Sequence, residues 1–171
     1  VRLRPSILVL LDASESMDIH DARRRERELE EAAMALGKLP FGKTSQVMDA
    51  KTRSEAAAVA RIALAKGILD NPNLAVFQKL DKNYKLRYFS FSDRVVPASG
   101  EGEELITSLR KVNATGKSTR IGTAIDDVVS RYSGQPIAGV LVLTDGASNE
   151  GIEPLEVARK MKDRDIPVFP V

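Results

Sequence analysis

The chain has 171 residues, 43% of them hydrophobic and 29% charged, and its formal net charge is +2 at pH 7. This length suits one domain with its own core, and the small, mixed charge argues against nucleic acid as a partner. Cysteine is absent, His20 is the only histidine, and the apolar runs are short. These features exclude disulfides and multi-histidine zinc sites, and no direct membrane insertion by this segment is expected.

The N-terminal half begins with a buried strand and continues with helices. Residues 6–11 form an apolar run without polar alternation, which is typical of a strand buried on both faces, and the run ends at Asp12. Farther along, helix formers place apolar residues at helical spacing. The predicted helices lie at residues 23–36, 54–69 and 74–80, with a loop at 38–49.

The C-terminal half alternates strands with helices. Strands are predicted at residues 86–91, 95–96, 139–143 and 166–171, and helices at 105–112, 122–132 and 153–162. Apolar strands that alternate with helices favour an α/β fold, in which helices cover both faces of a mainly parallel sheet.

Two of the buried strands each lead into an aspartate, Asp12 after the first and Asp145 after the strand at residues 139–143. Ligands of open α/β sheets bind beyond the carboxyl ends of the strands, so both carboxylates lie where a ligand is expected. Their repulsion favours a cation between them. The hydroxyls of Ser14, Ser16 and Thr119 add oxygen donors that suit a hard cation such as Mg²⁺.

The same residues occur in three segments, Asp12-x-Ser14-x-Ser16, Thr119 with the helix start at Gly122, and Asp145-Gly146. Their order resembles the metal-ion-dependent adhesion site of von Willebrand factor A domains. The resemblance implies a three-layer, Rossmann-like α/β/α fold with one short antiparallel edge strand in the sheet. It implies Ser14, Ser16 and Thr119 as direct ligands of Mg²⁺, with Mn²⁺ or Ca²⁺ as alternatives, and Asp12 and Asp145 as ligands through water.

The function implied by this resemblance is binding and not catalysis. In such domains the open coordination position of the metal takes an aspartate or glutamate of a partner protein. A protein that presents such a carboxylate is therefore the expected partner. Bacterial relatives of this general look are often parts of membrane-associated proteins, so the soluble part of a membrane-anchored bacterial protein is one expected setting, although the compartment is left open.

Two departures from the family pattern concern domain organisation. About seventy residues separate Asp12 from Leu86, more than one helix and its loops need, so residues 18–53 are expected to contain an insertion beside the metal loop. The chain begins with valine and ends within an apolar run, and the last helix of the family is missing after Val171. Residues 1–171 are therefore expected to be a single domain excised from a longer protein.

Three alternatives to a metal-dependent binding domain stay open. Residues 37–44 fit the phosphate-loop pattern G-x-x-x-x-G-K-T, which works only between a buried strand and a helix. Asp12 could also act as the nucleophile of an aspartyl phosphatase, although Ser14 stands where a second acid is usual. The third alternative is a scaffold domain of the same fold that makes no use of a metal.

Several polar residues that follow the predicted metal loop are expected to have no functional role. Asp18 and Asp21 could form a second cation site but are better interpreted as solvated loop residues. His20 is expected in the same loop without a role, and residues 23–25, three consecutive arginines, are expected on a solvated helix face.

Overall fold

A computed structural model describes residues 4–42, 47–100 and 103–171 of the chain. Its centre is a five-stranded sheet in the order β3-β2-β1-β4-β5. The strands are β1 (Ser6–Asp12), β2 (Lys85–Phe91), β3 (Val95–Pro97), β4 (Ile137–Leu143) and β5 (Val168–Pro170). All neighbours pair in parallel except β2 and β3, which form an antiparallel hairpin at one edge. The predicted α/β fold with one short antiparallel edge strand is confirmed.

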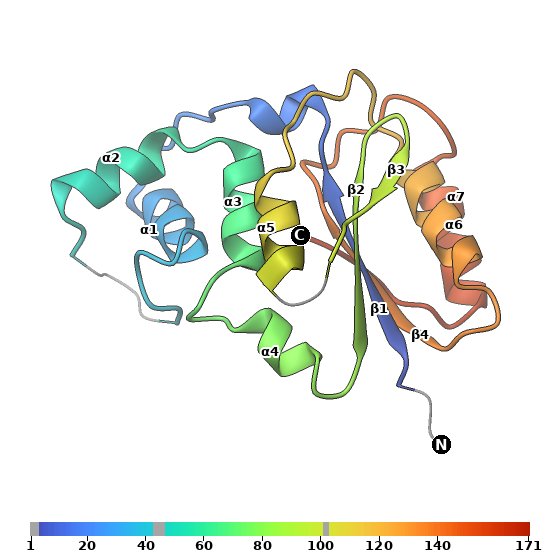
Figure 1. Cartoon of the computed structure of the whole chain (residues 1–171). Helices are drawn as coiled ribbons and strands as arrows, with labels where there is room; N and C mark the ends of the chain where they lie inside the picture. Colours follow the sequence, from blue (N-terminus) through green and yellow to red (C-terminus); the bar gives the residue numbers. More distant parts are fainter. Residues whose placement is uncertain (1–3, 43–46, 101–102) are drawn as a thin grey trace.

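Helices cover both faces of this sheet (Figure 1). The elements outside the sheet are η1 (Glu15–Asp18), α1 (Glu26–Ala35), α2 (Ala50–Ala58), α3 (Arg61–Leu69), α4 (Val76–Leu80), α5 (Glu103–Arg110), α6 (Ile121–Arg131) and α7 (Pro154–Asp163). Helices α6 and α7 lie on one side of the sheet and α3 and α5 on the other, while α1 and α2 lie outside α3.

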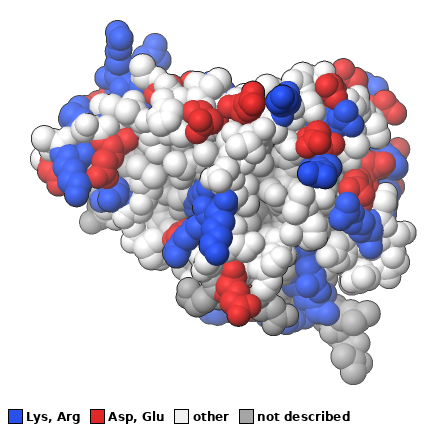
Figure 2. All heavy atoms as spheres, turned by 45° about the horizontal axis from the view of Figure 1, so that its top comes forward, with Lys and Arg blue, Asp and Glu red and all other residues white. Residues whose placement is uncertain are grey.

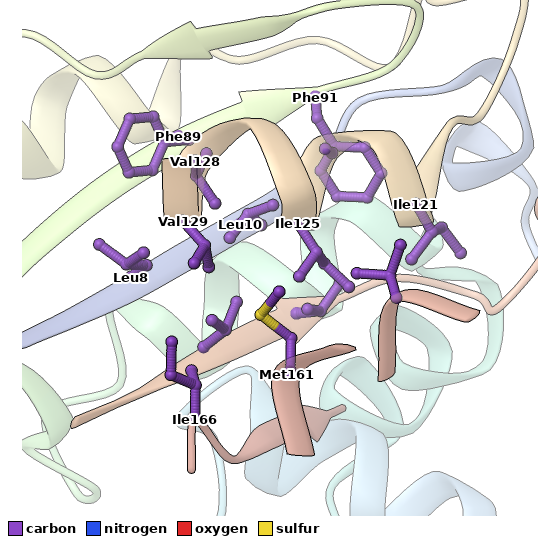
Figure 3. Packing of buried hydrophobic residues seen from close by; sticks show 14 residues of the cluster. Leu8, Leu10, Phe89, Phe91, Ile121, Ile125, Val128, Val129, Met161 and Ile166 are labelled. Carbon is purple, nitrogen blue, oxygen red and sulfur yellow. The ribbon is translucent and has the colours of Figure 1, made fainter. Parts of the chain in front are cut away.

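The side chains of β1 alternate between the two layers, because successive residues of a strand point to opposite faces. Leu8 and Leu10 pack with α6 and α7 in one core, which Figure 3 shows around Met161. Val9 and Leu11 pack with α3 and α5 in the other. Burial on both faces explains why this strand has no polar alternation and why it lies at the centre of the sheet.

A third apolar cluster joins α1 and α2 outside the main layers. Leu29, Ala33, Leu39 and Ala56 are buried in it, and Leu64 of α3 packs against it. The segment expected to contain an insertion, residues 18–53, therefore supplies α1 and the start of α2. This cluster packs against α3, and its described members include no residue of the sheet.

The helix predicted at residues 54–69 is wrong in one respect, because it is two helices. Val59 and Ala60 have extended backbones between α2 and α3. Residues of the loop before α1 form hydrogen bonds with backbone groups that have no helical partner at this break. His20 Nδ1 bonds to the carbonyl of Ala58, Arg23 Nη1 donates to the carbonyl of Val59 at 2.9 Å, and the Arg61 amide donates to Ile19. These long-range bonds outweigh the local helix propensity of the alanine-rich sequence.

Within the part of the chain that the structure describes, no helix has the length and apolar character needed to cross a membrane.

Candidate functional site

The carboxyl ends of β1 and β4 lie next to each other at one edge of the sheet. Leu11 pairs with Leu143 in the parallel register, so Asp12 and Thr144 come level at the strand ends. The Thr144 hydroxyl donates to Asp12 Oδ2 at 2.6 Å, and the Ser14 amide donates to Asp12 Oδ1 at 2.9 Å. Both oxygens of Asp12 therefore have donors, and both donors are uncharged.

Asp12 is fully buried, with no exposed surface. Burial raises the pKa of its carboxyl above the ordinary aspartate value, although the bonds from Thr144 and Ser14 oppose the shift. Among the residues that the structure describes, no basic side chain forms an ion pair with Asp12. A buried carboxylate without a positive partner is costly, so a cation at this place would stabilise it.

The loop after β1 brings two serine hydroxyls together, since Ser14 Oγ and Ser16 Oγ lie 3.0 Å apart. The Ser16 side chain is close enough to Asp145 to lower the pKa of that carboxyl. Asp145 accepts the Ala147 amide at 3.0 Å. Three of the five residues predicted as metal ligands, Asp12, Ser14 and Ser16, are thus joined by hydrogen bonds, and Asp145 lies beside them.

Thr119 precedes α6 and is 3% exposed. Its amide donates to Asn149 Oδ1 at 2.8 Å, and its carbonyl accepts the amides of Asn149 and Glu150. These bonds attach Thr119 to the loop that follows Asp145. They fix the backbone of the fifth predicted ligand, whereas its side chain has no hydrogen bond to the other four in the part of the chain that is described.

Gly116, in the connection between α5 and α6, lies beside the loop after β1. It forms an isolated parallel bridge with Ser14, and its amide donates to the carbonyl of Ala13. A Cβ at this position would lie 2.1 Å from the Cβ of Ser92. Only glycine allows this segment to approach the turn after β2 so closely.

Arg61, at the start of α3, also reaches this group. Its Nη1 donates to Asp145 Oδ2 at 2.7 Å, and its Nε and Nη2 form a two-point contact with Asp21 at 2.7 and 2.8 Å. The hydrogen bonds with Asp21 and then with Asp145 raise the pKa of Arg61. Although burial alone would raise the pKa of Asp145, the bonds from Ala147, Ser16 and Arg61 lower it below the usual range.

Sequence reasoning missed Arg61 because it lies 84 positions from Asp145 along the chain. Its other partner, Asp21, lies in a loop with 42% of its side chain exposed, as predicted, and the salt bridge with Arg61 is a contact that the sequence did not indicate. His20 likewise has a contact, with the carbonyl of Ala58. The three arginines at residues 23–25 precede α1, and the Arg23 side chain is only 12% exposed.

The phosphate-loop pattern at residues 37–44 lies after α1, a helix, and not after a buried strand. Gly37 and Gly42 both have positive φ, as turns require. Lys43 and Thr44 lie outside the described residues. The described part of the motif therefore lacks the strand that such a loop needs on its N-terminal side.

The donors of the site fit a hard cation better than a transition metal. The described residues contain no group of three or more His, Cys, Asp or Glu that could hold a metal ion on their own. The oxygens that are gathered here come from two carboxylates and from serine hydroxyls. Mg²⁺ accepts such a set, because it takes few carboxylates and keeps several of its waters.

Residues 74–171 match the family described as the von Willebrand factor type A domain. The chain belongs to this family. The matched range includes Thr119 and Asp145 but begins after the loop that carries Asp12, Ser14 and Ser16. No curated protein matches the sequence of this chain significantly.

Solved structures support the fold of this von Willebrand factor type A domain. BatB from Bacteroides thetaiotaomicron, a conserved hypothetical protein, is similar with a TM-score of 0.57 and 18% identity over 97% of this chain and 65% of BatB. An aerotolerance-related membrane protein from Bacteroides fragilis has a TM-score of 0.52 and 19% identity over 97% of this chain and 66% of its own.

The proximal thread matrix protein 1 of the mussel byssus is also similar, with a TM-score of 0.54 and 18% identity over 98% of this chain. This chain spans 37% of the mussel protein and 65% of BatB. One further structure of the mussel protein, with a TM-score of 0.50, has a zinc-occupied MIDAS motif. At these identities the likeness concerns the fold alone.

Proposed function

We propose that this domain is a metal-dependent protein-binding module. In this proposal Ser14, Ser16 and Thr119 hold a divalent cation, Mg²⁺ or else Mn²⁺ or Ca²⁺, and Asp12 and Asp145 support it through water. When bound, the cation supplies an electrophilic position for an aspartate or glutamate of a partner protein. The observation that carries the proposal is the fully buried Asp12 carboxylate, whose hydrogen-bond donors among the described residues are uncharged, beside the joined hydroxyls of Ser14 and Ser16.

Family membership supports binding over catalysis, because von Willebrand factor type A domains commonly mediate metal-dependent protein interactions. The described residues offer Asp12 no acidic neighbour two positions later that could assist a phosphatase, since that position is Ser14. The helix before residues 37–44 does not favour a nucleotide-binding loop either.

The partner surface must extend beyond the metal, because one ion-mediated contact is small compared with a stable protein interface. We propose that residues 18–53 are an insertion that contributes to this surface. The insertion would explain why the family match starts only at residue 74. Ile19, next to the loop after β1, is 46% exposed and would supply apolar contact area at the rim.

Figure 2 turns the edge that carries the site toward the viewer. Over the described part of this face, basic and acidic side chains are interspersed. The main electrostatic contact of a partner would therefore be with the metal, because the described part of this face offers no broad patch of charge of one sign.

Isothermal titration with Mg²⁺ and Mn²⁺ tests the metal site. We expect one site per chain in the wild type and at least a tenfold loss of affinity in Asp12→Asn, which keeps the size of the side chain but removes its charge. The matched control is Asp127→Asn, because Asp127 is an exposed carboxylate paired with Arg131 on α6. Unchanged binding in Asp12→Asn would contradict the proposed site, because the metal would then be bound elsewhere, and no uptake by the folded wild type would favour the scaffold alternative.

Capture of a carboxylate is tested separately with the Mn²⁺-loaded domain. Acetate that takes a coordination position displaces metal-bound water and lowers the enhancement of water-proton relaxation. We expect this decrease with acetate and none with acetamide, which has the same shape and no charge. Equal responses to both compounds would contradict the proposed ligand chemistry.

We also propose that the domain is part of a membrane-associated bacterial protein. The support is the fold likeness to BatB and to the aerotolerance-related membrane protein. Fractionation of the source cells, followed with an antibody against the domain, should recover it in the membrane pellet. Recovery in the soluble fraction alone would contradict this placement.

A further inference from the structure

Arg61 places a positive charge of the chain itself at the proposed metal site. Its Nη1 lies 2.7 Å from Asp145 Oδ2, and the Asp145 side chain is only 8% exposed. The same Nη1 also reaches the carbonyl of Ser16 at 3.4 Å. The guanidinium thus contacts two of the residues proposed to surround the cation.

The position of this guanidinium is fixed from its other side. Asp21 receives Nε and Nη2 in a two-point contact, which orients a planar guanidinium more firmly than a single bond. The Arg61 amide donates to the carbonyl of Ile19 at 3.1 Å. With 30% of its side chain exposed, Arg61 is enclosed well enough for its charge to act on the site.

The two carboxylates of the site are compensated unequally. Asp145 already has a positive partner, whereas no basic side chain of the described residues pairs with Asp12. A divalent ion would therefore meet less uncompensated negative charge than two free aspartates offer. Positive charges within a few ångströms of each other repel strongly when water is partly excluded.

We infer that Arg61 is a tethered cation that competes with the divalent metal for the charge of Asp145 and so sets the metal affinity of the site. The inference rests on the proposed function and adds to it a residue that determines affinity. Because Asp21 retains two bonds to the guanidinium, Arg61 stays at the rim when the metal takes over Asp145.

The test compares the dissociation constants of Mn²⁺ for the wild type, Arg61→Gln, Arg61→Lys and Arg120→Gln by isothermal titration. Loss of the charge in Arg61→Gln should tighten binding at least about tenfold. Arg61→Lys retains the charge and should stay within about threefold of the wild type. Arg120, beside Thr119 but paired with the exposed Glu150, is the matched control, and its substitution should change the affinity less than about twofold.

Equal or weaker binding by Arg61→Gln, with binding by the wild type intact, overturns the inference and leaves the proposed function standing. Absence of binding in the wild type and in all folded Arg61 variants overturns both. Binding by Arg61→Gln alone would show that Arg61 weakens metal binding, but it would overturn the proposed function, because the wild-type site would then hold no metal.

A measurement on the wild type guards against a variant that fails to fold. In ¹H–¹⁵N spectra the Nε–H signal of Arg61 should shift when Mg²⁺ is added, because Nη1 then loses Asp145, while the Nε–H signal of Arg120 should stay in place. An unmoved Arg61 signal, with shifted backbone amides of Ser14 and Ser16, overturns the inference although metal is bound.

Discussion

At the scale of single residues, the two aspartates of the site differ because their neighbours differ. Asp12 is surrounded by the uncharged donors of Thr144 and Ser14, and its burial raises its pKa. Asp145 is paired with Arg61, and the hydrogen bonds that Asp145 accepts lower the pKa of its carboxyl. Both carboxylates end strands of one sheet, so position in the fold alone does not determine their charge state.

The metal-free domain should therefore lose part of its stability as the pH rises. The unfolded chain ionises Asp12 near its ordinary pKa, while the folded chain resists ionisation up to the raised value. The contribution of Asp12 to the free energy of unfolding thus falls from about pH 4 upward through the raised pKa and is level above it. Asp12→Asn lacks this change.

The measurement is urea unfolding of both proteins in a metal chelator from pH 4 to 8. The stability of the wild type relative to Asp12→Asn should decrease with pH, and added Mg²⁺ should reverse the decrease. A difference between the two proteins that does not vary with pH would show that burial of Asp12 has no such cost.

At the scale of elements, the break between α2 and α3 is what directs Arg61 toward the site. The loop before α1 supplies the bonds at this break, among them Arg23 Nη1 to the carbonyl of Val59. If α2 and α3 were one continuous helix, Arg61 would lie in its middle and not at the start of a helix. The insertion and the site are therefore structurally connected through the first residue of α3.

Arg23→Ala should lower the free energy of unfolding by about 1–2 kcal/mol, because it leaves the Val59 carbonyl without this donor. The control is Arg27→Ala, since Arg27 forms an exposed ion pair with Glu31 within α1 and should have little effect. Chemical denaturation of the two variants measures the difference. Equal effects would mean that the bond to Val59 adds nothing.

The start of α6 is held close to the chain before α7. A Cβ on Gly122 would lie 2.1 Å from the carbonyl oxygen of Ile152. Gly122→Ala should cost about 1–3 kcal/mol through this overlap, even though alanine favours helices by roughly 1 kcal/mol. Thermal unfolding should show a lower melting temperature, whereas Ser130→Ala on the exposed face of α6 should melt near the wild type. A Gly122→Ala variant that melts near the wild type would show that this contact is loose.

At the scale of the whole molecule, the sequence was sufficient to predict the mainly parallel sheet and its two helical layers, and it placed the candidate site at one edge of that sheet. Apolar runs such as residues 6–11 determine burial on both faces, and parallel strands bring their ends to one edge. The split of residues 54–69 and the position of Arg61 could not be predicted, because both depend on bonds to residues 36 to 84 positions away. Local patterns contain no information on such contacts.

The predicted ligands were recognisable for a related reason. Asp12 and Asp145 follow strands whose pattern is strong, and Ser14 and Ser16 lie within four residues of Asp12. Thr119 depended on the resemblance to a family, because nothing in its immediate surroundings shows that the loop before α6 reaches the same edge. The bonds from Thr119 to residues 149 and 150 provide this connection.

The most direct test of the account is a crystal structure of the domain grown in MnCl₂, with an anomalous difference map calculated at the manganese absorption edge. One strong peak is predicted among the side-chain oxygens of Ser14, Ser16 and Thr119, with Asp12 and Asp145 behind the bound waters. A map without a peak there, or with manganese held only by surface carboxylates elsewhere, would contradict the central claim.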